Sequence, residues 1–216
     1  MVVIETDSQH QATVIWLHGL GDSGHGFAPI VPALNLPKSL GIKFIFPHAP
    51  IQPVTINGGM KMRSWYDIKN ISFKDRVDLS GIQSSAELVK QLIDEEIAAG
   101  IPSEKIILAG FSQGGVITYY LGLQYPQKLA GLMTLSTYIA NPTTISDERH
   151  SANQDTPLFI AHGQFDPVVP YQLAEQAQTI LEQLGYHLEF HSYPIDHSVC
   201  PEEIQAVGEW IQKCLT

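Results

Sequence analysis

The chain is poor in cysteine and in basic residues, and each scarcity excludes a class of protein. Only Cys200 and Cys214 are present among 216 residues. A disulfide framework needs more cysteines, so we expect two reduced thiols. Lysine and arginine number 12 against 22 aspartates and glutamates, which gives a net charge of −10. This charge argues against a surface for nucleic acid or for an anionic membrane.

Long apolar runs are also missing, and this absence bears on location. No stretch of about 20 apolar residues is present, so the sequence predicts no membrane span. Residues 1–7 do not combine a basic segment with a long apolar run, so we expect no signal peptide and a cytoplasmic location. No repeat or linker divides the chain. Its length and its 44% hydrophobic content suit one α/β domain over residues 1–216.

Segments of strand and helix character alternate along the chain. This alternation predicts a mostly parallel central sheet with helices on both faces. The predicted strands are residues 13–17, 43–46, 105–109, 131–136, 157–161 and 187–193. The predicted helices are residues 80–99, 171–184 and 201–214, with a further helix beginning near residue 115.

Two segments, residues 48–78 and 141–156, fit neither pattern and contain many glycine, proline or polar residues. We expect both to lack regular structure and to leave the carboxyl ends of strands. Ligands bind at that edge in open α/β sheets. The first segment is therefore predicted to be a loop insertion over an active site.

The most informative motif is Gly110-Phe111-Ser112-Gln113-Gly114, which follows an apolar run and precedes a segment able to begin a helix. Strand, G-x-S-x-G and helix form the nucleophile elbow of α/β-hydrolases, a tight turn that exposes the serine hydroxyl. Glycines at both ends avoid a collision of side chains across that turn. Taken alone, the motif also fits an ordinary glycine-rich link between a strand and a helix.

A nucleophilic serine needs a histidine base and an acid that orients it, in the chain order Ser, Asp or Glu, His. Asp166 follows the predicted strand 157–161, so we expect its carboxylate at the same sheet edge as Ser112. His197 follows the last predicted strand in a short loop from which an imidazole can reach the serine. Asp166 also fits a turn-capping role. Asp196 is a rival acid, but a direct sequence neighbour is poorly placed to hold the ring of His197.

The tetrahedral intermediate of such a reaction also needs two N–H donors for its oxyanion. We expect one from Gln113, directly after Ser112, and the other from Leu20 in the glycine-rich loop 18–24. His18 in that loop is better explained as a strand-end residue bonded to the backbone. The loop has neither a G-x-G-x-x-G nor a Walker pattern, which argues against nucleotide binding. No clustered histidines and cysteines suggest a metal, so we expect no cofactor.

Six stretches, spread in order over nearly the whole chain, carry a family resemblance. They are LHGLGD at 17–22, FPHAP at 46–50, MRSWYDI at 62–68, GFSQGG at 110–115, HG with DPVVP at 162–170, and HSV at 197–199. The chain resembles the phospholipase/carboxylesterase family of small α/β-hydrolases, which includes acyl-protein thioesterases and bacterial carboxylesterases. The resemblance implies a triad of Ser112, His197 and Asp166 and an oxyanion hole from Leu20 and Gln113.

The resemblance also implies an acyl groove beneath residues 54–68. Thioether and indole groups supply adaptable apolar surface in such grooves. The predicted groove residues are Met60, Met62, Trp65, Tyr138 and Val168. Each of them can equally serve to pack the loop onto the body of the protein. The chain departs from the family pattern at residues 195–196 and 137–138.

We therefore expect a serine carboxylesterase that hydrolyses short- to medium-chain esters through an acyl-enzyme. A lysophospholipase or an acyl-protein thioesterase with the same triad is the alternative. A non-catalytic binding protein would normally lack a member of the triad, and a peptidase of this fold would need an added domain. The expected partner is a small ester or acyl-lipid substrate. Transient contact with lipid or an acylated protein, and a homodimer, remain open, and no nucleic acid is expected.

Overall fold

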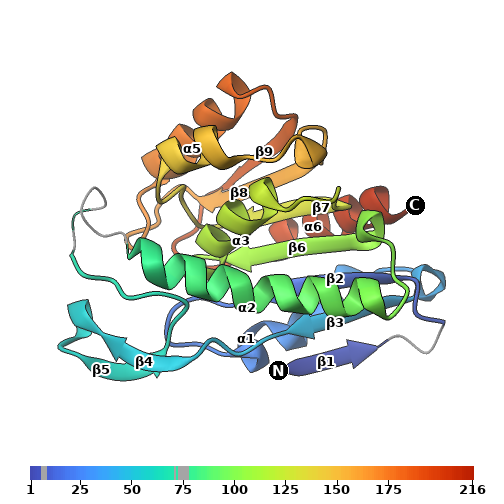
Figure 1. Cartoon of the computed structure of the whole chain (residues 1–216), viewed down its shortest axis with the longest axis horizontal. Coiled ribbons are helices and arrows are strands. Elements are labelled where there is room, and N and C mark those ends of the chain that lie inside the picture. The colour runs from blue at the N-terminus through green and yellow to red at the C-terminus, as the bar shows by residue number, and fades with distance from the viewer. Residues whose placement is uncertain (6–8, 71, 73–77) are drawn as a thin grey trace.

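A seven-stranded sheet forms the centre of the molecule, with helices on both of its faces (Figure 1). The computed structural model describes residues 1–5, 9–70, 72 and 78–216. The strand order is β1-β3-β2-β6-β7-β8-β9, and only β1 runs antiparallel to its neighbour. The strands are β1 (Val2–Glu5), β2 (Ala12–Leu17), β3 (Ile42–Phe46), β6 (Ile106–Phe111), β7 (Gly131–Leu135), β8 (Leu158–Gly163) and β9 (Leu188–Tyr193). The predicted mostly parallel sheet is confirmed, although the sequence patterns do not predict β1.

Strand β2 shows why both faces of the sheet are covered. Its side chains point alternately to opposite faces, so Ile15 and Leu17 join one apolar cluster while Val14 and Trp16 join the other. The helices α2 (Leu79–Ala98), α3 (Gln113–Gln124), α4 (Pro142–Glu148) and α5 (Tyr171–Gln183) supply residues to the first cluster. The helices α1 (Gly24–Phe27) and α6 (Pro201–Leu215) supply residues to the second.

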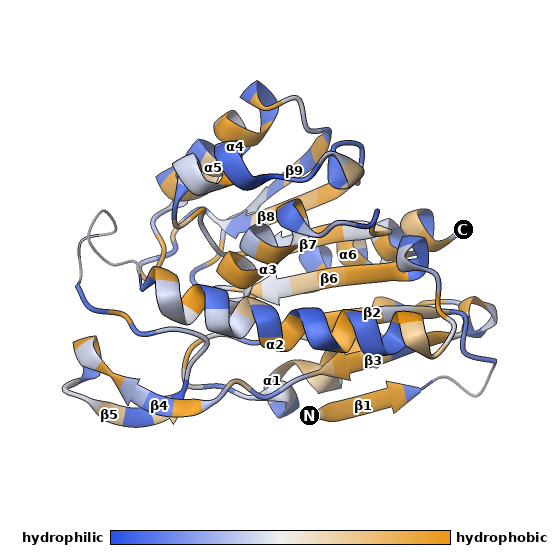
Figure 2. Ribbon diagram, viewed as in Figure 1, coloured by the Kyte–Doolittle hydropathy of each residue, from blue (hydrophilic) through white to orange (hydrophobic). Residues whose placement is uncertain are grey.

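Helix α2 forms because its apolar residues recur every three or four positions. Ile82, Ala86, Val89 and Ile93 are all buried and face the sheet. Figure 2 shows the resulting alternation of hydrophobic and hydrophilic residues along α2, in contrast to the continuous apolar character of β6. The predicted helix over residues 80–99 is thereby confirmed to within one residue at each end.

The first segment predicted to lack regular structure contains a β-hairpin. β4 (Ile51–Val54) and β5 (Met60–Arg63) pair antiparallel, and Gly58 and Gly59 close the turn at φ values of 65° and 76°. Proline is unusual within strands, so a sequence pattern that contains Pro53 does not predict β4. A two-stranded hairpin has only edge strands and therefore tolerates the proline. Residues 71 and 73–77 of the predicted segment lie outside the described residues.

The second such segment, residues 141–156, also has regular structure. Asn141 caps α4 by accepting a hydrogen bond from Thr144 N–H, and Pro142 occupies the first turn, where its missing N–H costs nothing. A 3₁₀ turn follows at Ser151–Asn153. The helix is short, so the periodicity that would predict it is too brief to recognise.

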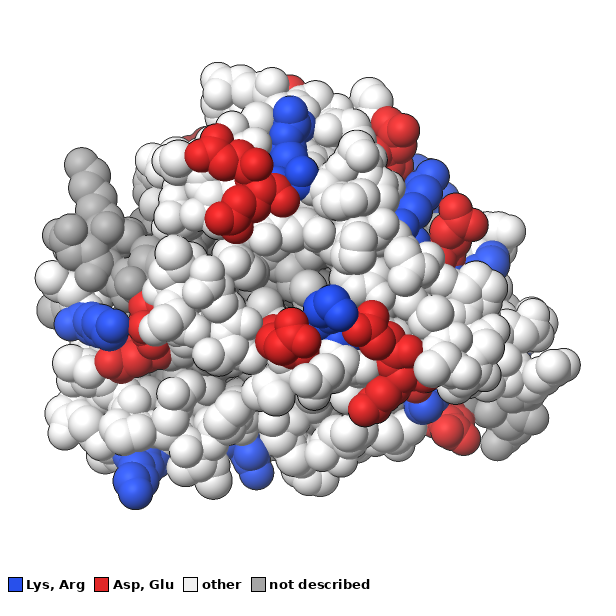
Figure 3. Space-filling view, viewed as in Figure 1, with Lys and Arg blue, Asp and Glu red and all other residues white. Residues whose placement is uncertain are grey.

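Charged side chains are dispersed on the face seen in Figure 3, where several basic groups of the described residues lie beside acidic ones and others, at the lower edge, do not. Lys90 pairs with Asp94 at 2.5 Å, and Lys69 pairs with Asp78 at 3.1 Å. Cys200 and Cys214 are free thiols, as predicted. Across the described residues, no helix combines the length and the apolar character that crossing a bilayer requires.

Glu203, in the first turn of α6, is buried with 1% of its surface exposed. Burial raises the pKa of its carboxyl from 4.5 to about 8, and the nearby backbone N–H of Cys200 opposes that shift. A carboxyl with a raised pKa keeps its proton in the folded state at pH values where the unfolded chain has lost it. Folding is therefore progressively penalised as the pH rises from about 4.5 to about 8.

We predict that Glu203→Gln will raise the melting temperature relative to the wild type, by an amount that grows from pH 5 to pH 8. A chain of this size gains roughly 2–4 °C per kcal/mol. Calorimetry at several pH values measures the difference. The exposed neighbour provides the control, because Glu202→Gln should leave the pH dependence of the wild type in place. An equal change at all pH values for Glu203→Gln would contradict the prediction.

Candidate active site

Three residues from separate loops meet at the carboxyl edge of the sheet. Ser112 directly follows β6, the fourth strand of seven, while Asp166 follows β8 and His197 follows β9. These strands are parallel, so their carboxyl ends lie at one edge. The sheet topology therefore brings together residues that are 31 and 85 positions apart in sequence.

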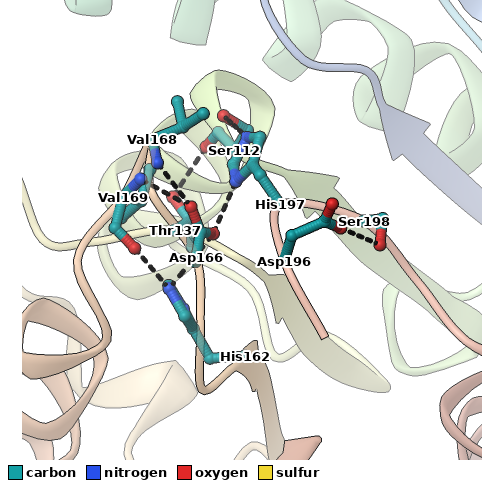
Figure 4. A network of polar contacts seen from close by, with 9 residues as sticks. All are labelled: Ser112, Thr137, His162, Asp166, Val168, Val169, Asp196, His197 and Ser198. Carbon is teal, nitrogen blue, oxygen red and sulfur yellow. Dashed lines mark hydrogen bonds and ion pairs between the residues drawn. The ribbon is translucent and has the colours of Figure 1, made fainter. Parts of the chain in front are cut away.

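A hydrogen-bond chain connects the three side chains (Figure 4). Ser112 Oγ lies 2.9 Å from His197 Nε2, and His197 Nδ1 lies 2.6 Å from Asp166 Oδ2. A carboxylate only accepts, so Nδ1 carries the proton and the lone pair of Nε2 faces the serine hydroxyl. In this tautomer the imidazole can take the proton of the serine. The ring also rests against Phe111, with 4.8 Å between the ring centres.

Ser112 occupies a tight turn that glycines make possible. Its φ and ψ are 52° and −117°, a region that side chains rarely adopt, with a cost of about 1–3 kcal/mol. A Cβ on Gly110 would lie 2.4 Å from the carbonyl carbon of Gly114, and a Cβ on Gly114 would lie 2.6 Å from the carbonyl oxygen of Leu17. Neither position admits a side chain, which accounts for both glycines of the motif.

The serine turn is also held by hydrogen bonds that sequence analysis did not anticipate. Ser112 N–H donates to Leu135 O at 2.9 Å, and Thr137 Oγ1 donates to Ser112 O at 2.6 Å. Leu135 is the last residue of β7, the strand next to β6, and Thr137 follows it by two residues. Thr137 lies in one of the two places where the chain departs from the family pattern, so no motif indicates its role.

Asp166 is 7% exposed and accepts hydrogen bonds on both of its oxygens. Its Oδ1 accepts from Val168 N–H and Val169 N–H, each at 2.8 Å, while its Oδ2 accepts from His197. Burial opposes ionisation, but the bonds from His197 and from the two backbone N–H groups outweigh it and lower the pKa of Asp166. The turn-capping bonds and the bond to His197 coexist, so the two roles considered for this residue do not exclude each other.

His162 closes the loop that carries Asp166. It is the second-last residue of β8 and is fully buried, and its Nε2 donates to Val169 O at 2.8 Å. The same nitrogen lies 3.5 Å from Asp166 Oδ2. Burial lowers the pKa of His162 more than these acceptors raise it, so the ring stays neutral. The contact of His162 with the loop of Asp166 was not foreseeable from the spacing of residues in the sequence.

Asp196 points away from the nitrogen atoms of His197 (Figure 4). Its Oδ1 accepts from Ser198 Oγ at 2.6 Å, which leaves Asp166 as the carboxylate on the imidazole. The loop of Asp196 packs on β8 closely, because a Cβ on Gly163 would lie 2.2 Å from Asp196 O. The geometry thus agrees with the choice of Asp166 over its rival.

Leu20 and Gln113 belong to two segments that meet at Ser112, the loop after β2 and the first turn of α3. A Cβ on Gly19, the residue before Leu20, would lie 3.5 Å from Ser112 Cβ, and Gln113 begins α3 directly after the serine. Within the described part of the chain, neither backbone N–H donates to a protein acceptor. Both are available for a substrate oxygen. His18 bonds to the backbone as predicted, because Nδ1 donates to Gly19 O at 2.7 Å and Nε2 accepts from Ala49 N–H at 3.0 Å.

The five predicted groove residues fall into two groups. Met60 and Val168 are 64% and 49% exposed, and Met62 is half-buried beside Gly21. Trp65 and Tyr138 are only 2% and 5% exposed. Their burial argues against a direct lining role for either. Trp65 is instead fixed by its indole N–H, which donates to His18 O at 2.8 Å.

A family profile described as phospholipase/carboxylesterase matches residues 1–215. The chain belongs to this family. Acyl-protein thioesterase 1 of Neurospora crassa is 40% identical over 99% of this chain and 91% of its own length. Acyl-protein thioesterase 1 of Cryptococcus neoformans is 39% identical over 98% and 96% of the two chains.

Solved structures agree with this assignment. Arabidopsis thaliana SOBER1 superposes with a TM-score of 0.90 at 32% identity, covering 95% of this chain and all of that one. Acyl-protein thioesterase 2 of Zea mays gives a TM-score of 0.87 at 29% identity, covering 100% and 98% of the two chains. The fold is the α/β-hydrolase fold, and this family member is a serine hydrolase of the esterase and thioesterase type.

The roles of the Asp166 and Asp196 carboxylates can be separated by experiment. We predict that Asp166→Asn will lower kcat by about 10⁴-fold, because an amide would hold the imidazole in the wrong tautomer. The matched control, Asp196→Asn, should keep kcat within about two-fold of the wild type, since among the described residues that side chain bonds only to Ser198. Steady-state kinetics with a p-nitrophenyl ester decides between them. A larger loss in the Asp196 variant would reverse the assignment.

Proposed function

We propose that this hydrolase removes acyl groups from acylated proteins or peptides by cleaving thioesters, with Ser112 as nucleophile, His197 as base and Asp166 as orienting acid. The observation that carries the proposal of hydrolysis is the hydrogen-bond chain from Ser112 Oγ through His197 to Asp166. The acyl-protein substrate is supported by the acyl-protein thioesterases that are about two-fifths identical over nearly the whole chain. These relatives favour the thioesterase over the carboxylesterase that the sequence patterns place first.

In the proposed reaction, His197 Nε2 accepts the proton of Ser112 as Oγ attacks the carbonyl carbon. Asp166 stabilises the imidazolium that forms. The N–H groups of Leu20 and Gln113 donate to the oxyanion. His197 then returns the proton to the leaving thiol or alcohol. Water, activated by the same imidazole, hydrolyses the acyl-enzyme and restores Ser112.

The same residues suit both esters and thioesters. A thiol has a pKa near 8.5, far below that of an alcohol, so a thiolate leaves with less help from the protonated histidine. The attack on the carbonyl is identical in the two cases. Substrate choice therefore depends on the surface that receives the acyl chain and the leaving group rather than on the triad.

For the acyl chain we propose a surface that includes Met60, Met62 and Val168. Val168 is tied to the triad, because its N–H donates to Asp166. Met62 lies against the loop of Leu20, with its Sδ 3.8 Å from the position of a Cβ on Gly21. The hairpin that carries the two methionines is joined to this loop by the bond from Gly21 N–H to Arg63 O at 2.8 Å. Trp65 and Tyr138 are buried, and the indole N–H of Trp65 donates to His18 O in the loop of Leu20.

We predict that Ser112→Ala will lose at least about 10⁴-fold in kcat on every substrate and will not react with a fluorophosphonate probe. The wild type should hydrolyse a palmitoylated cysteine peptide with a higher kcat/KM than a lysophospholipid or p-nitrophenyl acetate. The three substrates are compared at one pH with both proteins.

The outcomes separate the parts of the proposal. Full labelling of Ser112→Ala would reject the nucleophile. An inactive Ser112→Ala beside a wild type that prefers the small ester would keep the nucleophile and reject the thioesterase assignment. A preference for the lysophospholipid would replace the protein substrate by a lipid.

The acyl surface is tested by chain length. We predict that Val168→Asn will lose roughly four-fold more kcat/KM on an octanoyl ester than on an acetyl ester. This factor corresponds to the loss of one buried methylene contact, which contributes about 0.8 kcal/mol. Trp65→Ala should instead lose activity equally on acetyl, butyryl and octanoyl esters, since the buried indole supports the loop. A chain-length dependence in Trp65→Ala with none in Val168→Asn would move the groove to the indole.

A further inference from the structure

The side chain of Gln113 holds a distant segment of the chain against the serine turn. We call this segment, residues Ser64–Tyr66, the strap. Gln113 Oε1 accepts from Trp65 N–H at 2.8 Å, and Nε2 donates to Ser64 Oγ at 2.9 Å and to Tyr66 O at 2.6 Å. Gln113 is 3% exposed and Ser64 is fully buried. Both amide hydrogens and the amide oxygen are thus used on the strap.

The loop of Leu20 is held at two points, by the strap and by the residue just before it. The indole N–H of Trp65 donates to His18 O at 2.8 Å, and the two rings lie 5.3 Å apart. Just before the strap, Arg63 O accepts from Gly21 N–H at 2.8 Å. Leu20 therefore lies between two residues that are fixed by the strap or by its first neighbour.

The two N–H groups proposed for the oxyanion hole come from loops that follow different strands, β2 and β6. Pairing of these strands ends at Leu17 and Gly110, before either loop begins. Beyond that point the strap bridges the two loops, with Gln113 at one end and His18 at the other. At this bridge, a small displacement of the strap would change the distance between the N–H groups of Leu20 and Gln113.

We propose that the Gln113 side chain is a positioning residue that, through the strap, sets the separation of the Leu20 and Gln113 N–H donors. This inference rests on the proposed function, because it assigns the two N–H groups to an oxyanion. A primary amide suits the task, since it offers two donors and an acceptor on one short stem. Glutamate would lack the donors to Tyr66 O and Ser64 Oγ, and methionine would lack every bond.

The test compares two buried amides. Gln113→Met retains the volume and the backbone N–H but releases the strap. Asn153→Leu removes a fully buried amide that bonds to Leu129 N–H and Tyr125 O, far along the chain from the serine turn. Both variants should melt at a lower temperature than the wild type. We expect kcat of Gln113→Met to fall about 10- to 100-fold at unchanged KM, somewhat less than the loss of a whole oxyanion donor. Asn153→Leu should keep the wild-type kcat.

A second readout reports on the oxyanion directly. An octyl trifluoromethyl ketone adds to a serine hydroxyl and places its oxyanion in the hole. Its affinity for Gln113→Met should fall by the same factor as kcat, because both depend on binding of the transition-state charge. Where Gln113→Met fails to fold, Trp65→Phe tests the other end of the strap, since it removes only the bond to His18 O. It too should lower kcat and ketone affinity together.

The results have distinct meanings. An unchanged kcat or an unchanged ketone affinity in folded Gln113→Met, beside an inactive Ser112→Ala, would overturn the positioning role alone. Equal losses of kcat in Gln113→Met and Asn153→Leu would do the same. Retained turnover in Ser112→Ala would overturn the proposed function itself.

Discussion

The close approach of the first turn of α3 to the end of β2 is the constraint on which the rest of the site depends. Gly114 lies so near Leu17 O that no side chain fits there, and Ser112, two residues earlier, has a strained backbone. That contact puts the serine turn beside the loop of Leu20. The bonds from β7 and the buried amide of Gln113 then hold the turn in place. Loss of the close approach would separate the proposed nucleophile from the proposed oxyanion donor on Leu20, whereas Gln113 stays next to the serine in sequence.

The two histidines next to Asp166 are buried to different extents and therefore make different contacts. His162 has no exposed surface, stays neutral and donates to Val169 O. The His197 side chain retains 17% of its exposure and reaches the serine. Asp166 remains ionised between them, because its hydrogen bonds outweigh the cost of burial. One carboxylate is thereby held both by its own loop and by the residue that it orients.

Sequence patterns predicted the sheet and the three residues of the hydrogen-bond chain, because both can be inferred from short stretches of sequence and the order in which they occur. Apolar runs mark the strands, and parallel strands put every following loop at one edge. The patterns could not predict β4, since Pro53 interrupts it, nor the burial of Trp65, since an indole suits a core and a binding surface equally. The partners of the Gln113 side chain lie 47–49 positions away, and no periodicity connects them.

The wide spacing of the three residues along the chain has a consequence for folding. Ser112 and His197 are 85 positions apart, and the intervening strands β7, β8 and β9 must pair in turn before the two side chains meet. Contacts of this separation form late, because the entropy of closing long loops is lost before the contacts compensate for it. A nascent chain that has paired β2 with β6 carries the serine turn without the proposed base, His197. The hydrogen bond between Ser112 and His197 therefore forms only once the last edge strand has docked, so the proposed reaction requires the completely folded sheet.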